Sequence, residues 1–246
     1  LIFVIIKIYI KNKISKVYKY NMKILAIQNR MGIGDTIIFL PFIKALSKKF
    51  NSPISILVKE SSKANQYLDE TKYIDQIIIL DRDNKINRKH GGFFGFFNLI
   101  KDIKKYNFDK IFIFNSSLRF YLIARLSGIS EIYQYPLFKK TNQHITATPK
   151  KFFKDKLNLE ISDDPEIQIE KNKNPIKGFE INKNETNILL GIGGSGPTKR
   201  IPAKTFLKVI EELSKIKKSK FYLATGKKSE EQIILKEILD SKFQNN

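Results

Sequence analysis

The sequence contains no cysteine and only two histidines, His90 and His144. Without cysteine the chain cannot form disulfides, thiolate metal sites or iron–sulfur clusters, and it has no cysteine nucleophile. Two histidines also exclude a histidine-rich metal site. Acidic residues are scarce as well, with 24 Asp and Glu against 45 Lys and Arg, so the formal net charge is +21. The lack of cysteine fits a reducing compartment.

The composition is that of a globular protein. Of the 246 residues, 42% are hydrophobic and 12% aromatic, which is enough to build a core. This length corresponds to about one and a half average domains. The lysines are spread over many segments, a pattern that an AT-rich coding sequence produces. The charge therefore predicts a general attraction to anionic surfaces and no specific binding of nucleic acid.

Residues 1–21 (LIFVIIKIYIKNKISKVYKYN) stand apart from the rest of the chain. Their apolar run is interrupted by Lys7 and is shorter than the roughly 20 residues that a membrane helix needs. No cleavage site typical of a secretory signal follows. Two interpretations remain, an interfacial basic segment or a non-native extension upstream of Met22, and the second is favoured.

From residue 22 onward short apolar strands alternate with helical patterns. Strands are expected at 23–28, 54–58, 76–80 and 110–114, and helices at 36–50, 62–68, 98–106 and 118–126. Continuous apolar strands that alternate with helices indicate a parallel sheet covered on both faces. The sequence therefore predicts a Rossmann-like α/β domain over residues 22–165.

A second α/β region follows a polar stretch. Residues 166–185 are rich in charged residues and Asn and predict an interdomain linker, and 186–246 restart the alternation. Strands are expected at 187–192 and 220–224, with helices at 203–216 and 229–239. Because a complete α/β domain takes about 120 residues, 186–246 predict an incomplete second domain.

The first loop of chemical interest is 30–35 (RMGIGD), at the carboxyl end of the first strand. Open parallel sheets bind ligands at that edge. Asp35 begins the next helix, where a carboxylate can cap free N–H groups or act as a general base toward a hydroxyl. The loop is not a dinucleotide fingerprint, because the third glycine of that pattern would fall at Ile37.

The second loop is 191–202 (GIGGSGPTKRIP), which combines four glycines, two hydroxyl residues and two cations. A diphosphate needs backbone N–H donors, hydroxyl groups and a positive charge, and the loop offers all three before a helix that follows Pro202. The spacing is not that of a Walker loop, and a purely structural glycine loop is the alternative. Candidate phosphate ligands are Gly194, Ser195, Thr198 and Lys199.

Several segments together resemble one known family. MKILAIQNRMGIGDTIIFLPFIKALSKKF, YIDQIIILDRD, FDKIFIFNSSLRFYLIARLSG and GGSGPTKRIPAKTF occur in matching order from Met22 onward. They resemble glycosyltransferase family 9, which includes the lipopolysaccharide heptosyltransferases. The resemblance implies a GT-B fold, with a complete N-terminal acceptor-side domain and an incomplete C-terminal nucleotide-sugar-binding domain.

The resemblance also implies an activity and roles for particular residues. The enzyme would be an inverting, metal-independent glycosyltransferase without a cofactor, using ADP-heptose or a related nucleotide sugar and a lipopolysaccharide-core-like acceptor. Asp35 matches the family's catalytic base and Lys199 the lysine on the donor phosphates, assisted by Gly194, Ser195 and Thr198. Glu230 falls near the acidic residue that meets the nucleoside, although Glu231 leaves the register open. Arg30 and Arg119 are candidates for an acidic acceptor, or else solvated or helix-capping cations.

An anionic glycolipid acceptor implies a cytoplasmic enzyme at the inner face of the bacterial inner membrane. Two departures from the family bear on this expectation. The chain ends before a later Asp-Thr-Gly-x-x-His-like segment, and Gly191 stands where many relatives have histidine. The alternatives are a non-catalytic basic module that binds anionic membrane or nucleic acid, and an inactive fragment. A nucleotide-dependent oxidoreductase is disfavoured, because no G-x-G-x-x-G follows a strand.

Overall fold

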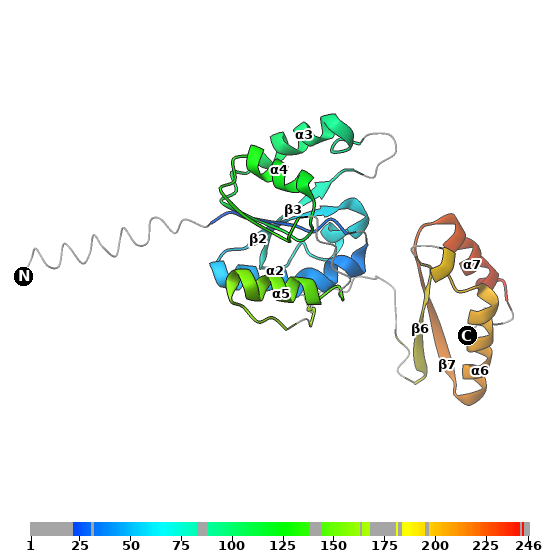
Figure 1. The fold of residues 1–246 in the computed structure, drawn as a ribbon. Coiled ribbons are helices and arrows are strands. Elements are labelled where there is room, and N and C mark those ends of the chain that lie inside the picture. The colour runs from blue at the N-terminus through cyan, green and yellow to red at the C-terminus, as the bar shows by residue number, and fades with distance from the viewer. Residues whose placement is uncertain are drawn as a thin grey trace, which may run out of the picture. The chain divides into compact units, whose positions relative to one another are not determined.

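The computed structural model forms two compact units, Leu1–Lys171 and Asn172–Asn246 (Figure 1). The structure describes residues 22–30, 32–82, 88–137, 144–162, 164–167, 181, 184–194, 197–241 and 243. The expected extension 1–21 lies outside the described residues, as do most residues of the expected linker 166–185. Each unit is described by itself below.

The first unit is built on a five-stranded parallel sheet in the order β3-β2-β1-β4-β5. The strands are β1 (Ile24–Ile27), β2 (Ile54–Lys59), β3 (Ile74–Leu80), β4 (Lys110–Ile113) and β5 (Glu131–Gln134). In the central strands Ile24 of β1 lies opposite Ile54 of β2 and Lys110 of β4. The predicted parallel α/β fold is confirmed.

Helices cover both faces of this sheet (Figure 1). On one face α2 (Ile33–Phe50) and α5 (Ala147–Leu157) pack against Ile24 and Ala26, and on the other α3 (Gly92–Lys104) and α4 (Leu118–Leu126) pack against Leu25 and Ile27. Successive β1 residues thus serve opposite cores, because side chains alternate along a strand. This double burial explains why β1 is apolar at every position.

Aromatic rings fill the core under α2 and α5. Phe42 of α2 and Phe153 of α5 are fully buried, with ring centroids 5.5 Å apart. Phe153 also stacks on Phe114 at 6.0 Å with an interplanar angle of 6°. These contacts anchor α5, which the sequence pattern did not predict, to the sheet.

Besides α5, the clearest differences from the sequence expectation in the first unit concern three elements. The expected helix 62–68 is replaced by two short 3₁₀ turns, Glu60–Ser62 and Ala64–Gln66, because Lys63 between them takes a left-handed φ of 49°. Helix α3 begins at Gly92, six residues before the expected start. Strand β5 was not predicted because its sequence, EIYQ, lacks a continuous apolar run.

The second unit contains a two-stranded parallel sheet and two helices. Strands β6 (Thr186–Ile192) and β7 (Ser219–Thr225) pair, and α6 (Ala203–Ile216) and α7 (Ser229–Leu239) join them in a small core around Ile192, Phe206 and Ile238. A 3₁₀ turn, Pro197–Lys199, precedes α6. All four predicted elements of this region are confirmed, and both helices have the expected bounds.

Candidate active site

The first unit's topology creates a switch point at its carboxyl edge. From β1 the chain runs outward to β2 and β3, then crosses to β4 on the other side of β1. Such a reversal leaves a crevice between the loops that follow the two central strands, where open α/β sheets bind ligands. Here the two loops are joined, because Asn115 Nδ2, after β4, donates to Asn29 Oδ1, after β1, at 3.1 Å.

Asp35 lies at this edge, in the first turn of α2, and is half-buried. Its backbone carbonyl accepts a hydrogen bond from Gln28 Nε2 at 3.2 Å. Its carboxylate has no hydrogen bond or ion pair with any residue that the structure describes. The helix starts from Gly32, whose φ of 107° suits glycine and which has no side chain to cap with. Within the described residues, Asp35 therefore holds an unengaged carboxylate at the switch point.

Gln28 braces the loop that carries Asp35. It is buried at the end of β1, and its amide oxygen accepts the Arg30 backbone N–H at 2.9 Å while its amide nitrogen reaches Asp35. Sequence reasoning did not single out this residue. The available signal was a polar side chain placed directly after a fully apolar strand.

A second amide braces the loop after β4. Gln134, at the end of β5, donates from Nε2 to the carbonyls of Asn115 (3.0 Å) and Ser117 (2.9 Å). Its Oε1 and the neighbouring Tyr135 hydroxyl are buried and have no hydrogen-bond partner among the described residues. Burial raises the pKa of Tyr135, and the nearby charge of Arg30 offsets part of this effect.

The two predicted acceptor arginines have different surroundings. Arg30 is exposed, whereas Arg119, in the first turn of α4, donates from Nη2 to the His90 carbonyl at 3.1 Å. The Arg119 guanidinium also lies 5.4 Å from the centre of the Phe96 ring. Burial lowers the pKa of Arg119, and the charge of Arg82 adds to this. Arg119 thus ties α4 to the start of α3, and its role toward an acceptor stays a prediction.

His90 is buried next to this contact and links β3 to α3. Its Nδ1 accepts the Asp81 backbone N–H at 3.1 Å, so Nε2 carries the proton and donates to Asp102 Oδ2 at 3.2 Å. Burial raises the pKa of Asp102, but hydrogen bonds from Lys89, Lys105 and His90 outweigh it and hold that pKa far below its usual range. Across the described ranges, no group of three acidic or histidine side chains is placed to hold a metal ion.

In the second unit, the glycine loop after β6 closes around Glu231. This side chain is buried in the first turn of α7, and its Oε1 accepts the Gly194 N–H at 3.4 Å. A Cβ added at Gly193 would lie 2.8 Å from Oε1, and one added at Gly226 would lie 2.2 Å from Oε2. A side chain at either glycine would displace this carboxylate, and at Gly193 the φ of 134° also favours glycine.

The other predicted donor residues lie within this loop or, in the case of Glu230, in the first turn of α7. Thr198 and Lys199 are exposed at the end of the 3₁₀ turn, and Ser195 lies outside the described residues. Glu230 is exposed, with its carboxylate 3.7 Å from Arg200 Nη2. Its own backbone N–H, together with the charge of Arg200, lowers the pKa of Glu230. Glu231, and not Glu230, contacts the glycine loop, and which of the two meets the nucleoside stays a prediction.

Arg200 is a further residue that sequence reasoning did not assign. Its side chain is mostly buried, and its Nε has no hydrogen-bond partner among the residues described. A buried guanidinium beside a glycine loop offers a second cation in addition to Lys199. The signal was present in the sequence, where the two cations are adjacent.

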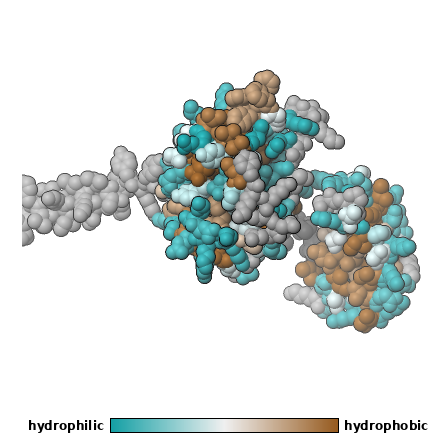
Figure 2. All heavy atoms as spheres, in the orientation of Figure 1, coloured by the Kyte–Doolittle hydropathy of each residue, from teal (hydrophilic) through white to brown (hydrophobic). Residues whose placement is uncertain are grey.

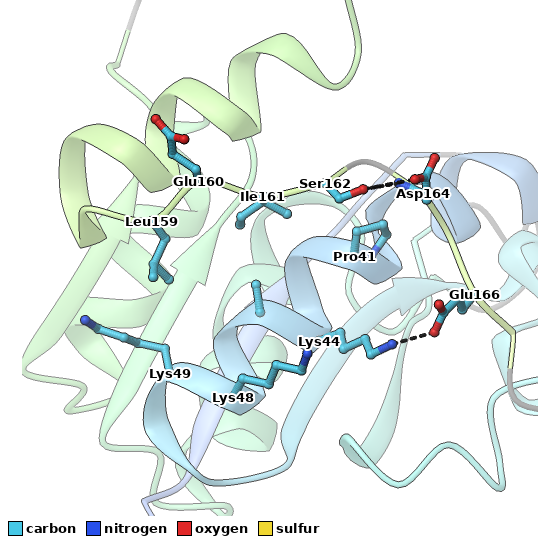
Figure 3. A pocket seen from close by; sticks show the side chains of 11 residues that line it. Pro41, Lys44, Lys48, Lys49, Leu159, Glu160, Ile161, Ser162, Asp164 and Glu166 are labelled. Carbon is cyan, nitrogen blue, oxygen red and sulfur yellow. Dashed lines mark hydrogen bonds and ion pairs between the residues drawn. The ribbon is translucent and has the colours of Figure 1, made fainter.

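A separate cavity of about 530 Å³ lies between α2 and residues 159–166 (Figure 3). Lys44, Lys48 and Lys49 line it from α2, and Glu160, Asp164 and Glu166 line it from the other side. Lys44 forms an ion pair with Glu166. None of the predicted site residues lines this cavity, so the cavity and the switch-point site are distinct.

Comparisons with known proteins agree with the fold. No protein-family model and no curated protein matches the sequence. Among solved structures, the chain is similar to a glycosyl transferase family 9 protein from Veillonella parvula, with a TM-score of 0.63, 16% identity, and coverage of 90% of this chain and 66% of that one. It is also similar to the E. coli ADP-heptose LPS heptosyltransferase II, with a TM-score of 0.61, 15% identity, and coverage of 91% and 70%. For the E. coli heptosyltransferase WaaC solved with ADP, the TM-score is 0.60 at 14% identity, with coverage of 89% and 72%.

The chain has the α/β fold of these glycosyltransferases. It spans about two thirds of the Veillonella chain's length. At these identities the likeness concerns the fold, and function has to be argued from the site. Over the described residues, no helix is both long and apolar enough to cross a bilayer.

Proposed function

We propose that this protein is a glycosyltransferase that transfers a sugar from a nucleotide-sugar donor, in which a nucleoside diphosphate carries the sugar, to an acceptor hydroxyl. The observation that carries the proposal is the Asp35 carboxylate, which no described residue engages, at the switch point of a sheet with the fold of known glycosyltransferases. A carboxylate without an internal partner is available to accept a proton from a substrate.

The proposed reaction is a single displacement. Asp35 accepts the proton of the acceptor hydroxyl, whose oxygen attacks the anomeric carbon. The bond from that carbon to the diphosphate breaks, the diphosphate leaves with the bonding electrons, and the configuration inverts. Lys199, with Thr198 and the amides around Gly194, stabilises the charge that gathers on the leaving group. Ser195 is proposed to assist there, and no step requires a metal or a cofactor.

We further propose ADP-heptose as the donor and an anionic glycolipid similar to a lipopolysaccharide core as the acceptor. Support comes from one of the structural neighbours, the E. coli heptosyltransferase WaaC, which was solved once with ADP and once with ADP-2-deoxy-2-fluoro heptose. The net charge of +21 suits an acidic acceptor, toward which Arg30 and Arg119 are the candidate ligands. With such an acceptor, the proposed reaction takes place at the cytoplasmic face of the inner membrane.

The base is tested with Asp35→Asn, which keeps the shape of the side chain and removes the charge. Turnover should fall by about 100- to 10,000-fold, the usual range for loss of a general base. Donor affinity should be unchanged. Because no described residue bonds to this carboxylate, the free energy of unfolding should change by no more than about 1 kcal/mol, the usual contribution of an acidic residue in the first turn of a helix. Asp69→Asn, an exposed carboxylate in a turn, serves as the control. Equal turnover in both variants would remove Asp35 from the mechanism.

The donor site is tested by calorimetry with ADP and ADP-heptose. Lys199→Ala should weaken binding by about tenfold or more, because it removes a charge-assisted contact with phosphate. Lys204→Ala, an equally exposed cation on α6, should not change it. If neither nucleotide binds the unmodified protein, the donor assignment fails, and the non-catalytic binding module takes its place.

A further inference from the structure

The first half of α3 exposes three phenylalanine rings. Phe93, Phe94 and Phe97 are 73%, 80% and 51% exposed. The rings of Phe93 and Phe94 lie 5.9 Å apart, and those of Phe93 and Phe97 lie 5.3 Å apart. Three large aromatic side chains thus form one cluster that faces solvent.

The neighbouring helix α4 extends this cluster. Leu118, Leu122 and Leu126 are all exposed, and their spacing of four residues puts them on one side of α4. Helices α3 and α4 cover the same face of the sheet, and Arg119 in the first turn of α4 bonds to the His90 carbonyl just before α3 and lies over the Phe96 ring of α3. Figure 2 shows hydrophobic side chains over both helices. We call these six residues the α3–α4 apolar surface.

Cations border this surface. In α3, Lys101 and Lys104 fall on the same exposed arc as the phenylalanines but one to two turns later, and in α4 Arg125 falls beside the leucines. Arg88 and Lys89 are exposed just before α3. The one acidic side chain within α3, Asp102, is already engaged by Lys89, Lys105 and His90. The border of the apolar surface is therefore positive.

An apolar centre with a basic border has the chemistry of a surface that lies on an anionic membrane. A second copy of this chain would bring two positive borders together, which opposes pairing, whereas anionic headgroups complement the border. The rings are mostly exposed to solvent, which suits insertion among lipid chains. We infer that the α3–α4 apolar surface docks the protein on an anionic lipid bilayer, with Phe93, Phe94 and Phe97 entering the membrane interface.

The position of the surface relates it to the candidate site of the same unit. Helices α3 and α4 both begin at the carboxyl edge of the sheet, where Asp35 also lies. Docking through their first turns would bring that edge toward the headgroups, where a lipid-linked acceptor is found. The inference goes beyond the proposed function, because vesicle binding requires neither donor nor sugar transfer.

A single tryptophan provides a local test, since the sequence contains none. Phe94→Trp places the reporter in the cluster, and Ile216→Trp places one at the end of α6; both positions are 80% exposed. With vesicles of equimolar phosphatidylcholine and phosphatidylglycerol, emission from position 94 should shift to the blue and be quenched by brominated lipid, while emission from position 216 should not. Vesicle binding without a shift at position 94, or with equal shifts at both, would overturn the inference.

The energetic test uses matched triple variants and co-sedimentation with the same vesicles. Phe93→Ser, Phe94→Ser and Phe97→Ser together should weaken binding by about tenfold or more, because the three rings supply most of the exposed apolar area of the surface. Leu189→Ser, Ile216→Ser and Ile233→Ser together remove exposed apolar side chains of the second unit and should leave binding unchanged. ADP affinity should be equal in both variants, which separates this test from that of the proposed function.

The basic border is tested separately. Lys101→Gln, Lys104→Gln and Arg125→Gln together should weaken binding to the anionic vesicles by about 100-fold, at roughly fivefold per charge, and unmodified protein should bind pure phosphatidylcholine far less. Sedimentation equilibrium measures self-association and so tests the alternative that the α3–α4 apolar surface pairs two copies of the chain. If the phenylalanine variant loses self-association while its vesicle binding stays intact, the surface pairs two copies and the membrane inference is wrong.

Discussion

Replacing Gly95 by alanine tests how closely α3 packs on the turn before it. Gly95 is a buried residue of α3, and a Cβ placed there would lie 2.2 Å from the His90 carbonyl carbon and 2.7 Å from its oxygen. Both are backbone atoms, so they cannot rotate away as a side chain would. The residues 88–91 or the helix itself must move.

The direction of the effect is opposite to that expected from helix propensity. Alanine is favoured over glycine in a helix by about 1 kcal/mol. Against this, overpacking costs about 1 to 3 kcal/mol. A shift of His90 also strains its bonds with Asp81 (2.8 Å) and Arg119 (3.1 Å), each contributing about 1 kcal/mol. Gly95→Ala should therefore destabilise the first unit by about 2 kcal/mol.

Gly34→Ala is the matched control. Gly34 is also helical, in the first turn of α2, but a Cβ there would meet nothing within 4 Å. Its substitution should stabilise the same unit by up to about 1 kcal/mol. Urea unfolding followed by circular dichroism gives the free energies. Hydrogen exchange of the α3 amides shows whether the loss of stability begins in α3. This measurement is needed because a protein of two units need not unfold in a single two-state transition. If the Gly95→Ala protein is as stable as the unmodified one, Gly95 does not pack closely on the His90 backbone and the reasoning is refuted.

Three further predictions concern stability. Phe153→Ala should destabilise the first unit by about 3 to 5 kcal/mol, because the ring is fully buried, whereas Phe94→Ala, at an 80% exposed position, should change it by less than about 0.5 kcal/mol in the same urea assay. Because the pKa of Asp102 is lowered in the folded protein, its charge stabilises the fold above about pH 4 and this contribution is lost on acidification. The stability difference between the unmodified protein and Asp102→Asn should therefore narrow as the pH falls below about 4; a constant difference would contradict the assignment. Glu231→Ala should destabilise the second unit by about 1 to 3 kcal/mol by leaving the Gly194 N–H without its acceptor, and Glu230→Ala by less, as measured by hydrogen exchange in β6.

Elements with a strong periodic pattern were predictable from the sequence. Helices α6 and α7 have the expected bounds, since their apolar residues recur at helical spacing between clear breakers. Elements whose stability comes from neighbours were not. Strand β5 pairs with β4 through its backbone, and α3 begins at Gly92 because its glycines allow close packing on His90, which local propensity opposes.

The residues of the candidate site likewise fall into those that the sequence could name and those that only the structure shows. The sequence could name Asp35 and the glycine loop as candidates, because both belong to short contiguous motifs that follow strands. The amides that brace the site, Gln28 and Gln134, were not found, because their partners lie on other loops or strands. The choice between Glu230 and Glu231 likewise depends on which one faces Gly194 across the unit.

The alternation of strands and helices over most of the chain, the parallel α/β class and the positions of the two loops follow from the sequence, because they depend on local periodicity and on glycine, proline and charge at fixed places. Only the tertiary structure decides which loops meet, which carboxylate is left without a partner, and which apolar side chains remain exposed on α3 and α4. The reason is physical. Hydrogen bonds and burial between residues far apart in the chain are set by how the elements pack, and no local pattern contains that information.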